Sequence, residues 1–420
     1  MKKITIKNTL YFYMFVASVI IFSNCSCERK SEDTSTTENI SKNAIVLQDK
    51  EISGFQRELL KLAMEAASKI PVDPHIKDRS RAQEQVIGTC LKLDQAQQAL
   101  EYAQRIDSWR RGYCYAEVAY YCVQHDKREY VSDLLETAEK IAKQDHSQQW
   151  RSDIIQAKIE QTQTLLKQTR QDNIPAEDAD LQMGNTEKNR ITVTVDDNTF
   201  NKWIKILDDL IAQDDLDITR NALNTYSKYF NRFYTDEQRR VLIENKIKSS
   251  WGKLPVIIKI DVLRDLAGHA LEHNDQNKAL QLVNETQVLL DSNNWALEDY
   301  IPQSAKIFEL RFRAGDKEKA RSDADALRTR FEEQRDKILN VERAGALRPL
   351  AQAYQTMGNT EVALSVYKQA VEEGVENPNS RPRAEDLSAT CCSMALYKIE
   401  PDDELWKRLR QISEELEHPW

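Results

Sequence analysis

The sequence has few of the residues that turn the chain between strands. Its 420 residues include only 10 glycines and 10 prolines. A sheet-rich protein of this length would need more turn residues. The composition therefore favours helices, and the length permits two or three ordinary domains or one long array.

The chain also lacks a strong excess of either charge. It carries 59 Lys and Arg against 68 Asp and Glu, which gives a net charge of −9. Such mild acidity argues against general affinity for nucleic acid, so we expect no nucleic-acid partner. Charged residues make up 30% of the chain and the mean hydropathy is −0.65. Both values are typical of exposed amphipathic helices and exclude a polytopic membrane protein.

Long hydrophobic runs are missing as well. The most apolar stretch, residues 9–22, contains 14 uncharged residues, whereas a membrane-spanning helix needs roughly 18 or more. Lys2, Lys3 and Lys7 precede this stretch. A basic start followed by a short apolar run is typical of a secretory signal peptide.

The sequence FSNCSC, residues 22–27, follows the apolar run. It resembles the lipobox of bacterial lipoproteins, in which an apolar residue and small residues precede a lipid-modified Cys. The resemblance implies that Cys25 is acylated. Asn24 departs from the usual Gly or Ala at its position, and Cys27 is the alternative acylation site.

The residues behind Cys25 have the composition of a tether. Residues 28–50 are rich in Ser, Thr, Asn and charge and poor in aromatic residues, so they cannot bury a core. Each buried acyl methylene contributes about 0.8 kcal/mol to membrane binding. The lipoprotein resemblance thus implies a signal peptide over 1–24 and a lipidated Cys with a flexible tether over 25–52. We expect the body to lie outside the cytoplasm in the bacterial cell envelope; plain secretion or an uncleaved anchor are the alternatives.

Motifs for catalysis or metal binding are missing too. Five cysteines lie beyond the leader, an odd number without zinc or redox spacing: Cys90, Cys114, Cys122, Cys391 and Cys392. The adjacent Cys391 and Cys392 could form a strained redox pair, but small buried helix residues are the favoured interpretation. His269 and His273 have helical i, i+4 spacing without a third metal ligand. With no Ser-His-Asp order, Walker loop or GxGxxG motif, we expect no enzyme activity, no metal and no cofactor.

A recurring spacing of bulky and small residues is present instead. Its best instance covers residues 346–371, where Gly358 and Asn359 predict a turn between two helices because Gly permits unusual backbone angles and Asn caps the next helix. Small residues at the contact positions let paired helices approach closely. The marked positions are Leu347, Leu350, Ala351 and Tyr354 before the turn and Ala363, Tyr367 and Ala370 after it.

This spacing resembles the tetratricopeptide repeat, a helix-turn-helix unit. Related spacings occur at 85–106, 115–138, 201–226, 262–286 and 306–327. The intervals are uneven, from 32 residues between Ala99 and Val131 to 43 between Ala320 and Ala363, against about 34 in the family. A more generic helical-repeat class therefore stays open. The resemblance implies an all-α, right-handed helical solenoid of about six to eight helix pairs.

The repeat spacing is interrupted once. The pentapeptide MGNTE at 183–187 returns at 357–361, but only the second copy has the repeat spacing around it. Residues 171–199 are therefore predicted to be a loop or insertion between an N-terminal helical block, 53–170, and a C-terminal block, 200–420.

Two further segments are interpreted from their polarity and position. Asp196 and Asp197 could be paired catalytic carboxylates, but a polar loop tip is the favoured interpretation. Residues 389–399 and 402–416 are predicted to be a closing helical pair, since the end units of a repeat array must be covered.

In the tetratricopeptide family, first-helix positions line an inner groove that holds peptide segments of partner proteins. The resemblance assigns Tyr113, Tyr120, Arg264, Arg348 and Gln352 to this partner-binding groove. Aromatic rings supply contact area and Arg supplies bidentate pairing. We therefore expect a non-catalytic protein-interaction scaffold, anchored to a membrane through its N-terminal lipid, with a protein or peptide partner. The alternative is the binding component of an envelope transport, carbohydrate-capture or enzyme complex.

Two basic clusters stand out in the acidic chain, Trp109-Arg110-Arg111 and Ser380-Arg381-Pro382-Arg383. Either cluster could contact a phosphate or a lipid headgroup, but a solvated face is the favoured interpretation. An exposed aromatic platform would favour carbohydrate as the ligand, whereas a polar and charged groove would favour peptide.

Overall fold

The computed structural model describes residues 45–145, 148–170, 195–252 and 254–420. Residues 48–420 form one compact unit, and every described helix belongs to it. Cys25, the first MGNTE copy and most of the predicted loop 171–199 lie outside the described residues.

Within the described ranges the protein has 17 α-helices and no strand. The N-terminal helices are α1 (Gly54–Lys69), α2 (Val72–Lys92), α3 (Ala96–Ala103), α4 (Arg110–Gln124), α5 (Val131–Gln144) and α6 (Gln149–Arg170). The next group is α8 (Asp197–Ile211), α9 (Leu216–Arg232), α10 (Glu237–Ser250), α11 (Val256–Glu272), α12 (Gln276–Asp291) and α13 (Leu297–Arg313). The last group is α14 (Lys317–Gln334), α15 (Asn340–Thr356), α16 (Thr360–Val375), α17 (Ser380–Tyr397) and α18 (Asp403–Glu414).

The turn between α15 and α16 shows why these residues form paired helices. Gly358 has a φ of +77°, a backbone conformation that favours glycine. The Asn359 side chain then accepts a hydrogen bond from the Val362 backbone N–H and caps α16. Ala351 and Ala363 are completely buried where the two helices meet. The turn and the small contact positions predicted from the sequence are confirmed.

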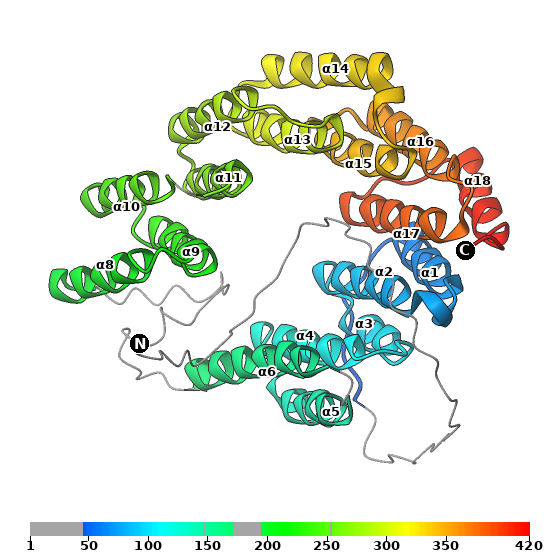
Figure 1. Cartoon of the computed structure of the whole chain (residues 1–420), viewed down its shortest axis with the longest axis horizontal. Coiled ribbons are helices and arrows are strands. Elements are labelled where there is room, and N and C mark those ends of the chain that lie inside the picture. Colours follow the sequence, from blue (N-terminus) through cyan, green and yellow to red (C-terminus); the bar gives the residue numbers. More distant parts are fainter. Residues whose placement is uncertain (1–44, 146–147, 171–194, 253) are drawn as a thin grey trace, which may run out of the picture. The chain divides into compact units, whose positions relative to one another are not determined.

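The helices form two layers, and the predicted all-α solenoid is confirmed. In the first layer each helix packs against the next, in the order α9, α11, α13, α15, α17, α2, α4 and α6. Figure 1 shows α11, α13, α15 and α17 following one another in this layer. Second-layer helices pack on their first-layer partners, which gives seven pairs among the described helices: α9–α10, α11–α12, α13–α14, α15–α16, α17–α1, α2–α3 and α4–α5.

The spatial order of the helices differs from their order along the chain. Helix α17 pairs with α1 and also packs on α2, so the N-terminal helices continue the array that the C-terminal helices begin (Figure 1). We call the contact of α17 and α18 with α1 and α2 the seam. The prediction that the last two helices close one end of the array is wrong, because α17 has packed helices on both sides. No repeat spacing within a continuous stretch could reveal a pair made from the two ends of the chain.

Polar contacts accompany the packing at the seam. The buried Gln56 side chain of α1 donates a hydrogen bond of 2.8 Å to the Ala395 carbonyl of α17. Arg381 of α17 lies 3.3 Å from Asp78 of α2. Since a typical intramolecular hydrogen bond contributes about 0.5–1.5 kcal/mol, apolar burial between α1 and α17 supplies most of the stability here.

Helix α6 ends this packing order, and α8 packs on α9 at its other end. Residues 171–196 connect α6 and α8 along the chain. Helix α8 begins at Asp197, and Asp196 caps it by accepting a hydrogen bond of 2.8 Å from the Thr199 backbone N–H. Asp197 accepts a bond of 2.6 Å from Arg239. The two aspartates therefore begin a helix and are not the loop tip predicted from the sequence.

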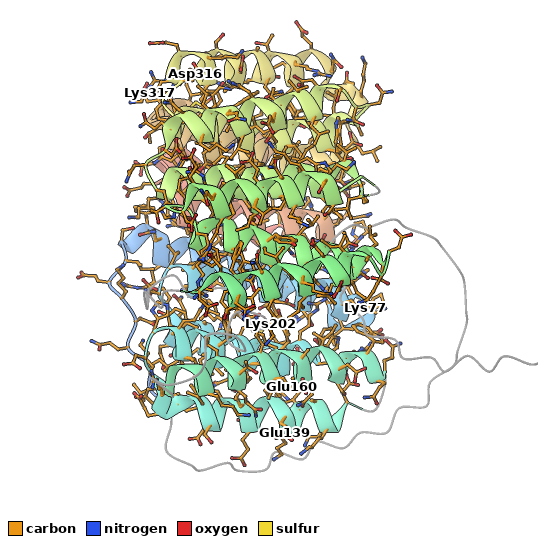
Figure 2. The ribbon with its side chains drawn as sticks, turned by 90° about the vertical axis from the view of Figure 1, so that its left-hand side faces the viewer. Lys77, Glu139, Glu160, Lys202, Asp316 and Lys317 are labelled. Carbon is orange, nitrogen blue, oxygen red and sulfur yellow. The ribbon has the colours of Figure 1, made fainter. Side chains whose placement is uncertain are left out.

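The surface carries charges of both signs. Figure 2 shows side chains projecting from the stacked helices, and its labelled Lys77, Glu139, Glu160, Lys202 and Lys317 are all exposed. Within the described ranges, no helix combines enough length with enough apolar character to cross a bilayer.

Candidate functional site

All five residues predicted to line a groove lie on first-layer helices. Tyr113 and Tyr120 belong to α4, Arg264 belongs to α11, and Arg348 and Gln352 belong to α15. Each of them therefore lies on a helix of the first layer. They do not converge on one point, because α13, α15, α17 and α2 stand between α11 and α4 in the packing order.

Three of these residues bridge neighbouring first-layer helices. Arg348 donates a hydrogen bond of 2.7 Å to Asp386 of α17, and Gln352 donates one of 2.8 Å to Ser393. Arg264 donates to Gln303 of α13. These bonds hold the first layer together, so the side chains have a structural role besides any contact with a partner.

The two tyrosines are less open than a binding groove would require. Tyr120 is only 8% exposed, and the Lys158 ammonium of α6 lies 4.0 Å from its ring centre. Lys158 also lies 2.9 Å from Glu117. Burial, together with the nearby Glu117 carboxylate, raises the pKa of the half-buried Tyr113 phenol. The Tyr120 ring is thus part of the packing between α4 and α6.

Ionised groups of the first layer are held in unfavourable surroundings. Burial raises the pKa of carboxyls on α2, α11, α13, α15 and α17: Glu84, Asp265, Glu309, Glu342, Glu385 and Asp386. Burial likewise lowers the pKa of Lys306 on α13. Asp265 and Glu342 are nevertheless exposed residues, so the first layer offers partly desolvated charges that solvent can still reach.

Charges on the other layer are stabilised instead. Burial alone would raise the pKa of Glu244 on α10, but hydrogen bonds from Lys248 and Lys278 lower it. A hydrogen bond to Glu372 raises the pKa of Arg408 on α18. Perturbed ionisable groups collect at functional sites more often than elsewhere, and this contrast directs attention to the first layer.

A pocket of about 550 Å³ lies where the N-terminal ends of α2, α4 and α6 meet the C-terminal end of α5. We call it the Trp–Arg pocket. Its lining consists of Ile76, Lys77, Arg81, Asp107, Ser108, Trp109, Arg110, Arg111, Ile141, Gln144, Asp145, Trp150 and Arg151. Five cations face two carboxylates in this lining, although the whole chain has a net charge of −9.

Two tryptophans form the aromatic part of the Trp–Arg pocket. The rings of Trp109 and Trp150 meet edge to face, with centroids 5.4 Å apart and planes at 79°. The guanidinium of Arg110 lies 4.9 Å from the Trp109 ring centre, and that of Arg151 lies 5.6 Å from the Trp150 ring centre. Such contacts between a cation and a ring contribute about 0.5–1 kcal/mol at exposed sites and fix the Arg side chains at the pocket wall.

The cations of the Trp–Arg pocket fall into two groups. Arg110 is paired with Glu84, and Arg151 lies 3.5 Å from Asp145. Lys77, Arg81 and Arg111 have no carboxylate within 4.0 Å among the described residues. The pocket therefore has three cations that form no direct ion pair within the described part of the protein, although Arg81 acts on Glu84 and Glu385 from a longer distance.

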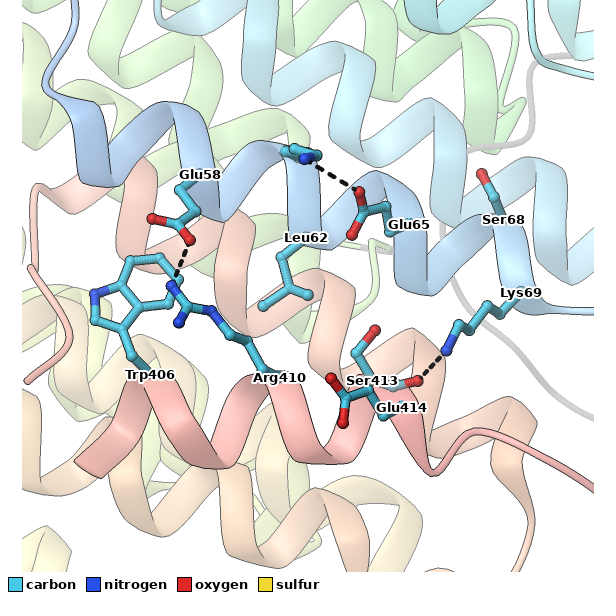
Figure 3. Close-up of a pocket in the computed structure, with 10 residues that line it drawn as sticks. Glu58, Leu62, Glu65, Ser68, Lys69, Trp406, Arg410, Ser413 and Glu414 are labelled. Carbon is cyan, nitrogen blue, oxygen red and sulfur yellow. Dashed lines mark hydrogen bonds and ion pairs between the residues drawn. The ribbon is translucent and has the colours of Figure 1, made fainter. Parts of the chain in front are cut away.

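A second pocket of about 540 Å³ lies at the seam between α1 and α18. Figure 3 shows its walls, and we call it the seam pocket. Arg410 is paired with Glu58, Lys61 lies 3.8 Å from Glu65, and Lys69 donates to the Ser413 carbonyl (Figure 3). Three cations and three carboxylates line it, so its charges balance within the protein.

Sequence reasoning noticed one half of the Trp–Arg pocket and missed the other. The sequence favours a solvated face at Trp109-Arg110-Arg111 and gives no separate prediction for Trp150-Arg151. The available signal was the repeated Trp-Arg dipeptide at the beginning of two helices, α4 and α6. These helices pack directly against each other, which brings the two dipeptides together.

The histidine and cysteine candidates have ordinary structural partners. His273 stacks on Tyr234 with ring centroids 4.3 Å apart, while His269 lies 3.2 Å from Glu272. Cys391 and Cys392 are buried free thiols, as predicted. Among the described residues, no three His, Cys, Asp or Glu side chains gather in a way that could hold a metal ion.

Comparison with known proteins adds no family to these observations. No protein-family model matches the sequence, and no curated protein matches it either. What is established is therefore an almost entirely helical chain whose packing is compatible with a helical-repeat protein.

Proposed function

We propose that the protein is a non-catalytic binding scaffold for a protein or peptide partner, built on a repeat of the tetratricopeptide type. The observation that carries the proposal is the first layer itself. It brings charged and polar side chains from α9 to α6 into one continuous series of neighbouring helices. Repeat arrays use such extended surfaces to bind partners.

The electrostatics of the first layer support this proposal. Burial raises the pKa of carboxyls on five of its helices. Their ionisation at neutral pH therefore lowers the stability of the folded protein. Ionised carboxyls that destabilise the free protein, yet are partly exposed, are suited to pair with positive charges of a partner. Tetratricopeptide-like spacing at Ala351 and Ala363 is consistent with the same interpretation.

The proposal includes attachment to a membrane. We propose that Cys25 is acylated after removal of residues 1–24 and that the polar segment behind it connects the lipid to the helical body in the bacterial envelope. The predicted tether over 25–52 is too long at its end, because Asp49 accepts hydrogen bonds from the Gln97 and Gln98 backbone N–H groups of α3. The support is the basic start, the 14-residue apolar run and the FSNCSC sequence.

Two experiments test the proposed function. Cells producing the Cys25→Ala variant are fractionated after labelling with palmitate, and we expect loss of label and release from the membrane. If this variant keeps the palmitate label and stays in the membrane fraction, Cys25 is not the anchor. The double variant Cys25→Ala, Cys27→Ala would then test the alternative site.

Partner binding is tested by cross-linking the full chain in membranes and identifying the captured proteins. The matched control is a variant with Ala351→Leu, which perturbs a helix pair. We expect a specific protein to be captured by the natural chain and to be reduced in the variant. Capture of no protein above background, or turnover of a substrate by the purified chain, would contradict the scaffold proposal.

A further inference from the structure

We infer that the Trp–Arg pocket binds an acidic peptide segment, one with at least two carboxylate side chains beside an apolar side chain. This inference rests on the proposed role as a binding scaffold and identifies the chemistry of the bound segment. It starts from the three cations without a described carboxylate partner, Lys77, Arg81 and Arg111.

The charge of the pocket selects an anionic ligand. Five cations and two carboxylates line it, which leaves an excess of three positive charges in a chain of net charge −9. The first turns of α4 and α6 also lie in the lining, together with the C-terminal end of α5. The N-terminal ends of two helices carry partial positive charge and the C-terminal end of one carries partial negative charge. Both the side chains and the helix ends therefore leave an excess of positive charge, which favours a bound carboxylate over a bound cation.

The distribution of the cations favours several separate carboxylates over one compact anion. Lys77 and Arg81 stand on α2, whereas Arg111 stands on α4, and the first two are exposed. Arg110 and Arg151 are already engaged with carboxylates of the protein. A single phosphate would require cations that converge on one point, whereas carboxylates along a peptide can each meet a different cation.

The aromatic part of the pocket accounts for the apolar side chain. Trp109 is half-buried, and Trp150 is 41% exposed; Ile76 and Ile141 line the same pocket. The edge-to-face arrangement of the tryptophans, with a guanidinium near each ring, offers no flat open platform for a sugar ring. An aliphatic or aromatic side chain can instead insert beside the rings and displace water from apolar surface.

The test is a titration of the full chain with a dye-labelled peptide of sequence Glu-Glu-Leu-Phe-Glu-Asp, followed by fluorescence anisotropy. A peptide with Gln and Asn in place of Glu and Asp is the charge control. We expect the acidic peptide to bind at least about tenfold more tightly than its neutral version, and more weakly as salt is raised.

Variants locate the binding. Arg81→Glu combined with Arg111→Glu should weaken binding at least about tenfold, and the milder Lys77→Gln about threefold. Lys61→Glu combined with Lys407→Glu, near the seam pocket, changes the net charge equally and should alter affinity less than about twofold. Melting curves of all variants check that they are folded.

Four results would overturn the inference. One is that the folded Arg81→Glu, Arg111→Glu variant binds the acidic peptide as tightly as the natural chain does. Another is absence of peptide binding up to millimolar concentration. The third is charge-dependent binding of phosphatidylglycerol vesicles or inorganic phosphate in place of the peptide, which would assign the pocket to a lipid headgroup or a free anion. The fourth is capture of a protein partner that persists in the double variant. It would show that the pocket is not the binding site and would leave the scaffold proposal intact.

Discussion

The Trp–Arg pocket and the seam pocket have nearly the same volume, about 550 and 540 Å³, but the first has an excess of cations and the second is balanced in charge. In the seam pocket each of the cations Lys61, Lys69 and Arg410 meets an acceptor of the protein. In the Trp–Arg pocket three of five cations lack a described carboxylate. The difference teaches that size does not identify a binding site in this fold, whereas unneutralised charge does.

The seam pocket has a structural explanation. It forms because α18 packs beside α1, the helix that pairs with α17. Its polar side chains stabilise a contact between helices from the two ends of the described chain. The Trp–Arg pocket joins helices that follow one another in the chain, so its cations are not needed to hold distant segments together.

The largest effect is expected from breaking the seam. Leu59 of α1 is completely buried, and Leu59→Ala should reduce the free energy of unfolding by about 2–5 kcal/mol. Lys61→Gln, on an exposed position of the same helix, should stay within about 0.5 kcal/mol. Urea unfolding measures both. Equal losses for the two variants would contradict the structural role of the seam.

A smaller effect is expected from overpacking one helix pair away from both pockets. Ala351 is completely buried between α15 and α16, and Ala351→Leu should cost about 1–3 kcal/mol. Glu361→Gln at the exposed start of α16 should change stability by less than about 0.5 kcal/mol. Thermal melting compares them, and similar shifts would show that the repeat register is wrong.

Replacing a carboxylate by its amide should change the melting temperature in opposite directions in the two layers. Burial raises the pKa of Glu385 above 4.5, so the folded protein holds this proton more tightly than the unfolded chain does. Its ionised form therefore lowers stability at neutral pH, and this loss disappears as the pH falls below 4.5. We expect Glu385→Gln to raise the melting temperature at pH 7 and to have no such effect near pH 4.

The control for this prediction lies on α16. Glu372 forms hydrogen bonds of 2.8 and 2.9 Å with Arg408, an exposed ion pair of the kind that contributes up to about 1 kcal/mol. Glu372→Gln should lower the melting temperature slightly or leave it unchanged at pH 7. A destabilising Glu385→Gln would contradict the electrostatic contrast between the layers.

The smallest stability effect is expected in the Trp–Arg pocket. Arg111→Gln removes a cation that has no described carboxylate partner, so the melting temperature should remain within the range of a surface substitution, about 0.5 kcal/mol in free energy. Differential scanning calorimetry makes the measurement. A loss above about 1.5 kcal/mol would mean that Arg111 has a structural role.

The sequence predicted those parts of the fold that depend on local spacing. The small residues Ala351 and Ala363, together with the turn at Gly358, fix a helix pair within 25 residues, and the structure confirms it. The pairing of α17 with α1 joins residues more than 300 positions apart, as the bond from Gln56 to Ala395 shows. No short-range pattern contains that information.

The site was less predictable than the fold for a related reason. Register assigned Arg264 and Arg348 to the first layer, but register cannot tell whether a neighbouring helix supplies a partner such as Gln303 or Asp386. The Trp–Arg pocket depends on the packing of α4 against α6, which brings together Trp109 and Trp150, 41 residues apart in the sequence. Both cases require knowing which side chains face each other.

The most direct test of the central claim, that unneutralised charge separates a binding pocket from a structural one, is hydrogen–deuterium exchange with and without a saturating amount of the acidic peptide. Slower exchange is predicted in segments covering residues 107–115 and 148–155, with unchanged exchange over 58–69 and 403–414. Protection confined to the two seam segments, or equal protection at both pockets, would contradict the claim.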